Sequence, residues 1–191
     1  MSAARSILVA VFLGIAGTAV AGPLEDGETA YKRGDYAAAL QLLRPLADQG
    51  IARAQLDLGL MYSGGRGVPQ DYDAASRWYG KAADQGYAEA EFQLGLSYLS
   101  GKGVERSDSE AAKWFRKAAD QANEGAQIAL GTLYAGGHGV PRDYVLAHMW
   151  YNLVAVQGNG LAATMRDELA AKMTPKQSAE AQRLAREWKP K

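Results

Sequence analysis

Paired glycines recur three times in this chain, and such turns can bind phosphate. They stand in GRGV at 65–68, GKGV at 101–104 and GHGV at 137–140. A nucleotide-binding loop needs one glycine-rich turn directly after a strand, where backbone N–H groups surround the phosphates. Here the glycines return at a fixed interval, each time after a helical pattern. We therefore interpret them as turns that need special backbone angles, and the sequence predicts no cofactor site.

Other residues that could carry chemistry do not form a site either. The two histidines, His138 and His148, are ten residues apart on different predicted elements, so they lack the i, i+4 spacing of a helical metal pair. Recurrent aspartates precede glutamines at equal repeat positions, which indicates solvated helix ends and not a carboxylate pair for acid–base catalysis. These aspartates are Asp48, Asp84 and Asp120. No G-x-S-x-G nucleophile motif occurs. The sequence thus predicts no catalytic and no metal-binding residues.

A 36-residue step sets the elements that carry these turns. Leucine–glycine pairs begin at Leu58, Leu94 and Leu130. A tryptophan followed by a second aromatic ring returns at the same interval, at Trp78, Trp114 and Trp150. Self-similarity at a period of this size indicates stacked small units. We expect Trp114 to be buried, because it belongs to the central repeat, and Trp188 near the end to be less important for stability.

The residue pattern predicts two helices in each unit. The first covers 52–63, where Ala54, Leu58 and Tyr62 recur at i, i+4 and i+8. The second starts after a residue suited to cap a helix N-terminus. These residues are Asp35, Asp71, Ser107 and Asp143, with Glu110 expected to complete a capping box on Ser107. Two more helices follow, over 161–172 and after the Thr174-Pro175 pair, so we expect an all-α fold of about nine helices beyond the leader.

The first 21 residues differ from the rest and predict a signal peptide. Arg5 precedes an apolar segment over 7–16, and Ala19-Val20-Ala21 predicts cleavage before Gly22. The alternative is a membrane anchor, but the apolar segment is shorter than the roughly 20 residues that a spanning helix needs. The expected organisation is a leader over 1–21, an N-terminal half-repeat or cap over 22–50, three repeats over 51–158 and capping helices over 159–191.

Composition limits the partners. The chain has 21 basic and 21 acidic residues, and the basic ones are scattered, which argues against a nucleic-acid or anionic membrane surface. We expect no stable membrane insertion after the leader is removed. Cysteine is absent, which excludes a lipid-modified leader.

The repeated unit resembles the Sel-one-like repeat, a relative of the tetratricopeptide repeat with a longer turn between its helices. The resemblance covers 54–86, 90–122 and 126–158, with local departures at Ala122, Glu105 and Ser107. It implies a right-handed α-α superhelix, or solenoid, that works as an adaptor and holds protein partners on its concave face. Some secreted relatives carry a disulfide in each repeat, and the absence of cysteine removes that parallel.

Residues that differ between the repeats are not needed for the stacking contacts that all repeats share, so they are available to bind a partner. On the first helices, which the resemblance places partly on the concave side, they give a candidate partner groove of Arg53, Asp57, Leu60, Glu89, Gln93 and Leu96. We expect charge reversal at Arg53 and Glu89 to weaken binding with little change in stability. If the groove is not the site, the edge formed by the glycine turns is the next candidate, at Arg66, Lys102 and His138.

Three functional hypotheses follow. The first is an exported, non-catalytic repeat scaffold that mediates protein–protein interaction in the bacterial cell envelope, in the periplasm or after secretion, with a protein or peptide as partner. The second is a structural accessory of an envelope polysaccharide or secretion assembly. The third is an enzyme that acts on cell-wall material, for which no catalytic set can be assembled from the sequence.

Overall fold

The structure is a computed structural model that describes the backbone of residues 12–191 and the side chains of 22–191. Most of the predicted leader, 1–11, lies outside the described residues. Within them every regular element is a helix. The helices are α1 Phe12–Lys32, α2 Tyr36–Asp48, α3 Ala52–Gly64, α4 Tyr72–Ala83, α5 Ala88–Ser100, α6 Asp108–Asp120, α7 Glu124–Gly136, α8 Tyr144–Ala155, α9 Gly160–Ala170 and α10 Pro175–Glu187.

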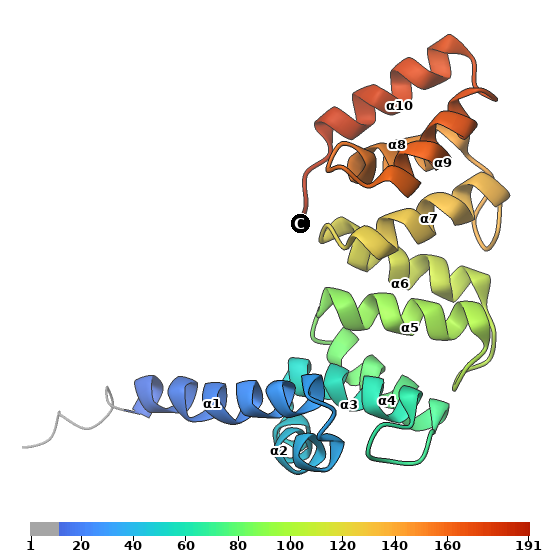
Figure 1. The fold of residues 1–191 in the computed structure, drawn as a ribbon. Helices are drawn as coiled ribbons and strands as arrows, with labels where there is room; N and C mark the ends of the chain where they lie inside the picture. The colour runs from blue at the N-terminus through green and yellow to red at the C-terminus, as the bar shows by residue number, and fades with distance from the viewer. Residues whose placement is uncertain (1–11) are drawn as a thin grey trace, which may run out of the picture.

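The helices stack in pairs into an elongated array, and the all-α solenoid prediction is confirmed (Figure 1). The pairs are α1–α2, α3–α4, α5–α6 and α7–α8, and each pair packs on the next. The two last helices, α9 and α10, both pack on α8 and cover the end of the stack. The described residues hold one helix more than the nine expected beyond the leader. The additional helix is α1, which starts inside the leader and continues to Lys32.

The predicted N-caps start α2, α4, α6, α8 and α10. The side chains of Asp35, Asp71 and Asp143 accept hydrogen bonds from backbone amides of the first turn, at 2.8–3.1 Å. Thr174 forms the capping box with Gln177. Of the two hydrogen bonds in the capping box expected at Ser107, only one forms. The Ser107 hydroxyl accepts from the Glu110 amide at 3.2 Å, but the Glu110 carboxylate pairs with Lys113 at 2.6 Å.

The second glycine of each turn is the point where one repeat lies on the repeat before it. Gly103 has a φ of +73°, and a Cβ at this residue would overlap the Tyr72 carbonyl group at the start of α4. The Ser76 hydroxyl of the same helix donates to the Lys102 carbonyl at 3.0 Å. Gly67 and Gly139 make the equivalent approaches to Tyr36 and Asp108. The turns interpreted as structural are therefore contacts between neighbouring repeats.

The glycine of each leucine–glycine pair makes room for an aromatic ring. A Cβ on Gly95 would stand 2.5 Å from the Phe115 ring, and Gly59 and Gly131 receive the Tyr79 and Tyr151 rings in the same way. All three rings are nearly or fully buried. The ring that follows each tryptophan thus closes the contact between the two helices of a repeat.

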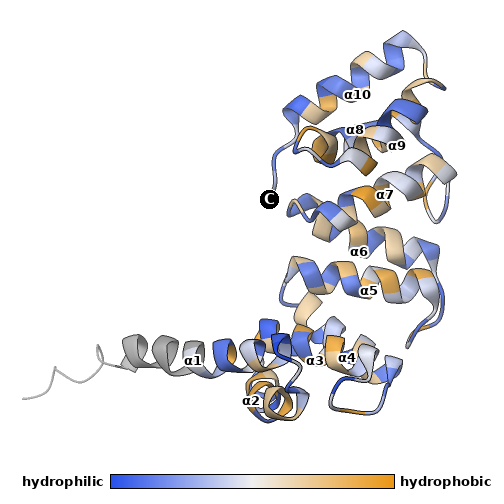
Figure 2. Ribbon diagram, viewed as in Figure 1, coloured by the Kyte–Doolittle hydropathy of each residue, from blue (hydrophilic) through white to orange (hydrophobic). Residues whose placement is uncertain are grey.

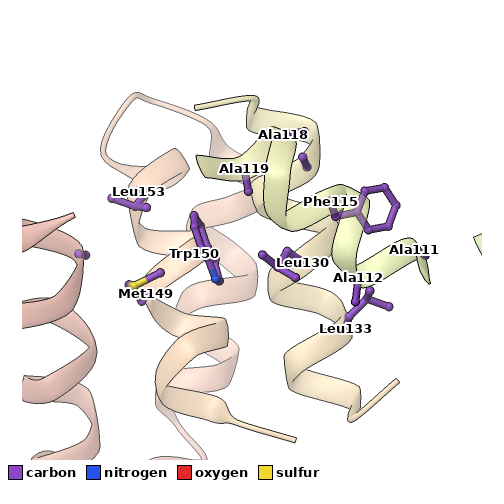
Figure 3. Packing of buried hydrophobic residues seen from close by; sticks show 12 residues of the cluster. Ala111, Ala112, Phe115, Ala118, Ala119, Leu130, Leu133, Met149, Trp150 and Leu153 are labelled. Atoms are coloured by element: carbon purple, nitrogen blue, oxygen red, sulfur yellow. The ribbon is translucent and has the colours of Figure 1, made fainter. Parts of the chain in front are cut away.

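The expectation that Trp114 is buried is wrong. Trp114 is only partly buried, whereas its neighbour Phe115 has no exposed surface. The Lys117 ammonium lies over the Trp114 ring, 3.8 Å from the ring centroid. Trp150, at the equivalent position of the last repeat, is fully buried because α10 covers it, with the Trp188 ring at 6.0 Å in an edge-on arrangement. Figure 3 shows its side chain among the other hydrophobic residues of this cluster.

The substitution of alanine for the closing glycine has a local cost. Ala122 has a φ of +63°, and it is the one non-glycine residue with a positive φ among the described residues. An L-residue in this region costs about 1–2 kcal/mol. The backbone of the second repeat nevertheless closes like that of the first, where Gly86 has a φ of +77°. The expectation that this departure leaves the fold intact is confirmed.

Candidate interaction groove

A cleft of about 450 Å³ opens between α3, α4 and α5. One side of it is formed by α5, and the other side is formed by the end of α3 and by α4. The residues that give it its character are Ser63, Tyr72, Gln93, Leu96, Ser100 and Lys102. Gln93, Leu96 and Ser100 lie at i, i+3 and i+7 of one helix, so they share a face. This cleft is the candidate groove of the solenoid.

The cleft combines an apolar floor with polar groups at its rim. Leu96 is 36% exposed, which is unusual for a large hydrophobic residue in this chain. The Lys102 ammonium lies 4.9 Å from the centroid of the Tyr72 ring. The Tyr79 hydroxyl donates to the Ser63 hydroxyl at 3.0 Å, and burial raises the pKa of Tyr79, so this phenol stays protonated. Leu96 can thus contact an apolar side chain while amide and hydroxyl groups pair with a peptide backbone.

Two of the six predicted groove residues, Gln93 and Leu96, line this cleft. Leu60 is partly buried in the hydrophobic cluster between α3 and α5. Glu89 accepts hydrogen bonds from Gln93 at 2.9 Å and from Asn123 of the next repeat at 3.0 Å. The alternative prediction was the edge formed by the glycine turns. One of its residues, Lys102, also lines the cleft, so the two predicted surfaces meet there.

The other two predicted groove residues, Arg53 and Asp57, lie away from the cleft, where α1 contacts α3. Asp57 is 8% exposed, and the expectation that it is a surface residue is wrong. The Arg53 Nε lies 3.7 Å from the Asp57 carboxylate and 3.2 Å from that of Glu28 on α1. The Arg53 guanidinium also donates to the Tyr87 hydroxyl at 3.1 Å. The sequence analysis missed this burial because it did not assign the helix that carries Glu28.

These contacts also change the expected result of charge reversal at Arg53 and Glu89. Reversal at Arg53 would place a third acid beside Asp57 and Glu28, and reversal at Glu89 would break its bond to Asn123. Like charges at i and i+4 of one helix destabilise it, and Asn123 would lose the acceptor of its hydrogen bond. The expectation of unchanged stability therefore does not hold, and this double variant cannot isolate binding.

Asp57 should make the stability of the protein depend on pH. Burial raises its pKa to about 6, against the opposing effect of Arg53. The unfolded pKa is about 3.9, so the folded state binds more protons between pH 4 and 6, and the stability from this group is lost as the pH rises through that window. We expect Asp57→Asn to match the wild type near pH 4 and to be more stable at pH 7 by about 1–3 kcal/mol.

Urea denaturation at the two pH values measures this difference. The control is Asp84→Asn at an exposed helix end, which should change the free energy of unfolding by no more than about 0.5 kcal/mol. If Asp57→Asn were less stable than the wild type at pH 7, the ion pair with Arg53 would outweigh the cost of burying the carboxylate.

Buried polar side chains connect the two helices of a repeat, and the sequence pattern did not reveal them. Gln55, Glu91 and Gln127 occupy one repeat position and are at most 4% exposed. The Gln85 amide donates to Gln55 at 2.8 Å, and the Gln121 amide donates to Glu91 at 2.9 Å. The signal was the aspartate–glutamine pair, which was interpreted as helix-end solvation. Its glutamines in fact bind the buried side chain of the preceding helix, so their role is structural.

Between residues 22 and 191 no three histidine, aspartate or glutamate side chains come close enough to hold a metal ion. No described helix combines the length and the apolar character needed to cross a membrane.

Comparison with known proteins identifies the repeat. The family model described as Sel1 repeat matches residues 20–51, 52–87, 88–123 and 125–159, which together make up most of the chain. The chain belongs to the Sel1 repeat family. Its first match covers α1 and α2, so the segment expected to be an N-terminal half-repeat or cap is matched as a repeat of its own. Sel1 repeat proteins are generally scaffolds for protein interaction and are typically non-catalytic.

Solved structures agree with this family. The crystal structure of a Sel1 repeat protein from Oxalobacter formigenes is 38% identical, with a TM-score of 0.70, and the similarity covers 73% of this chain and 57% of that one. A second is c5321, a protective antigen of uropathogenic Escherichia coli with an SLR fold, 37% identical, with a TM-score of 0.77 and coverage of 87% and 38%. The chain thus spans between about two fifths and three fifths of these proteins. A search among curated proteins gave no match.

Proposed function

We propose that this Sel1 repeat protein is a non-catalytic scaffold that binds a peptide segment of a protein partner in the cleft between α3, α4 and α5. The observation that carries the proposal is the exposed Leu96 beside Gln93 in a cleft of about 450 Å³. An extended or helical peptide can place one apolar side chain on Leu96 and use the surrounding amide, hydroxyl and ammonium groups for its backbone. A few residues that lose their water at the centre of an interface supply most of its binding energy.

The test replaces Leu96 by lysine and compares it with a matched control. Val156→Lys makes the same kind of change at another exposed apolar residue, at the end of α8. For a partner isolated by pulldown from envelope extract, calorimetric titration should show at least a tenfold weaker affinity for Leu96→Lys and an unchanged affinity for Val156→Lys. Both variants should unfold within about 0.5 kcal/mol of the wild type, because both sites are on the surface. Unaltered affinity of Leu96→Lys would place the site elsewhere.

We further propose that the scaffold acts in a bacterial envelope, in the periplasm or after secretion. The support is the leader pattern, with Arg5 before the apolar segment and small residues at Ala19 and Ala21. The expected cleavage point before Gly22 lies in α1, upstream of the Glu28 contact with Arg53, so the mature chain keeps that contact. Mass spectrometry of the protein from envelope fractions should show Gly22 as the first residue. A retained Met1 on membrane-bound protein would support an anchor instead.

A further inference from the structure

A second cleft, of about 360 Å³, lies at the other end of the array between α8, α9 and α10. This volume is within the range of small-molecule sites. Its lining is polar, and Figure 2 shows that α10, which forms one wall, is mainly hydrophilic. The residues that define its chemistry are His148, Asn152, Arg166, Asp167, Gln182 and Arg186.

The repeat pattern explains why the cleft is here. His148 occupies the position of Ser76, whose hydroxyl binds the glycine turn of the next repeat. No further repeat follows α8. The two capping helices α9 and α10 pack on α8 instead, and they have no glycine turn to fill the same space. The polar side chains of three helices therefore converge where a repeat would otherwise pack on the next.

Two guanidinium groups face this cleft. One is held by hydrogen bonds, and the other is unpaired. Arg166 is held in place, since its Nη1 donates to Asn152 at 3.2 Å and its Nε donates to Asp167 at 2.8 Å. Arg186 makes no ion pair or hydrogen bond with any side chain between residues 22 and 191. The two acids nearest to it along α10, Glu180 and Glu187, both pair with Arg183 at 2.5–2.6 Å. Arg186 thus has all of its donors available.

His148 supplies a second, independent observation. It is 3% exposed, and its Nδ1 has no hydrogen-bond partner. Burial, with a contribution from Arg166, lowers the pKa of His148, so the ring is neutral at pH 7 and carries one donor and one acceptor. A buried polar atom without a partner is rare in proteins. In a polar cleft beside an unpaired guanidinium, it leaves a polar atom that no residue between 22 and 191 satisfies.

We propose that this cleft binds a small organic molecule that carries a single carboxylate next to an amide or hydroxyl group. Arg166 and Arg186 against Asp167 leave one net positive charge, which matches a monoanion. A guanidinium fork pairs with a carboxylate through two parallel hydrogen bonds, and Arg186 is available to make them. Gln182 and the His148 ring then pair with the neighbouring polar group. A dianion such as phosphate is disfavoured by the Asp167 carboxylate. The site is separate from the cleft at Leu96 and does not depend on the proposed function.

The two histidines allow a direct test by NMR. The imidazole signals of His148 report on the cleft, and those of His138, exposed in its glycine turn, serve as an internal control. Millimolar N-acetylglycine should shift the His148 signals in a saturable manner and leave His138 unchanged. N-acetylglycinamide, which lacks the charge, and inorganic phosphate at about pH 8, where the dianion predominates, should cause no saturable shift. The absence of a His148 shift with N-acetylglycine, or an equal response to phosphate, would overturn the proposal.

Variants on α10 separate a specific site from general charge attraction. Arg186→Gln should weaken N-acetylglycine binding at least tenfold, whereas Arg183→Gln, which removes the same charge from a residue paired on the surface, should leave it unchanged. Equal losses in both variants would contradict a specific site. The carboxylate can belong to a free molecule or to the end of a protein chain. N-acetyl-tetraglycine binding as well as N-acetylglycine indicates a chain terminus, and weaker binding of the peptide indicates a free molecule.

Discussion

Replacing Trp150 with alanine should lower the free energy of unfolding by about 3–5 kcal/mol, the range for deleting a large buried aromatic side chain. Trp150 is fully buried among residues of α6, α7 and α10. It contacts the Trp188 ring edge-on at 6.0 Å, and the Arg116 guanidinium lies 5.0 Å from its centroid. The substitution therefore leaves a cavity at the junction of the last repeat with its cap, where neighbouring helices cannot close around it.

Trp114→Ala is the matched control, because it deletes the same side chain at the equivalent position of the central repeat. Trp114 is partly exposed, and it leaves the buried Phe115 in place, so we expect less than half the loss seen for Trp150. Urea denaturation followed by circular dichroism measures both. A larger loss of unfolding free energy for Trp114→Ala would mean that the tryptophan of each repeat, and not the aromatic residue after it, forms the core of the array.

Replacing Gly103 with alanine should cost about 3 kcal/mol or more, from two sources. An L-residue at a φ of +73° costs about 1–2 kcal/mol. The new Cβ would also overlap the Tyr72 carbonyl group, which is backbone and cannot rotate away, and overpacking of this kind costs typically 1–3 kcal/mol. Since the contact joins the repeats over 52–87 and 88–123, these two repeats should separate before the helices themselves unfold.

Gly86→Ala separates the two sources. Gly86 has a similar φ of +77°, but no atom lies within 4 Å of the Cβ position, so only the backbone strain applies. Its expected cost is about 1–2 kcal/mol. Equal losses for the two variants would show that the repeats can shift apart at Gly103 at no cost, and that the turn is not a packing contact. Denaturation of both proteins under identical conditions gives the comparison.

The groove could be located from the sequence only in part. Gln93 and Leu96 were predicted because they vary between repeats, and they line the cleft. Asp57 was predicted for the same reason, because it also varies between repeats, but it is buried. Variation shows that a position is free of the contacts shared by all repeats, but it does not show that the position is exposed. At Asp57 the Arg53–Glu28 contact brings in α1, a helix that the 36-residue pattern does not predict.

The residue pattern alone predicts the helix pairs, the N-cap of the second helix in each pair and the period of the stack. These depend on local interactions, such as the Asp71 side chain on its own first turn, and on a pattern that returns every 36 residues. Tertiary structure alone decided which residues at the ends are covered. Trp150 and Trp114 have the same place in the repeat, yet only Trp150 is fully buried, because α10 packs over it. Burial depends on what lies on the far side of a residue, and for the terminal repeats that neighbour is not another copy of the repeat.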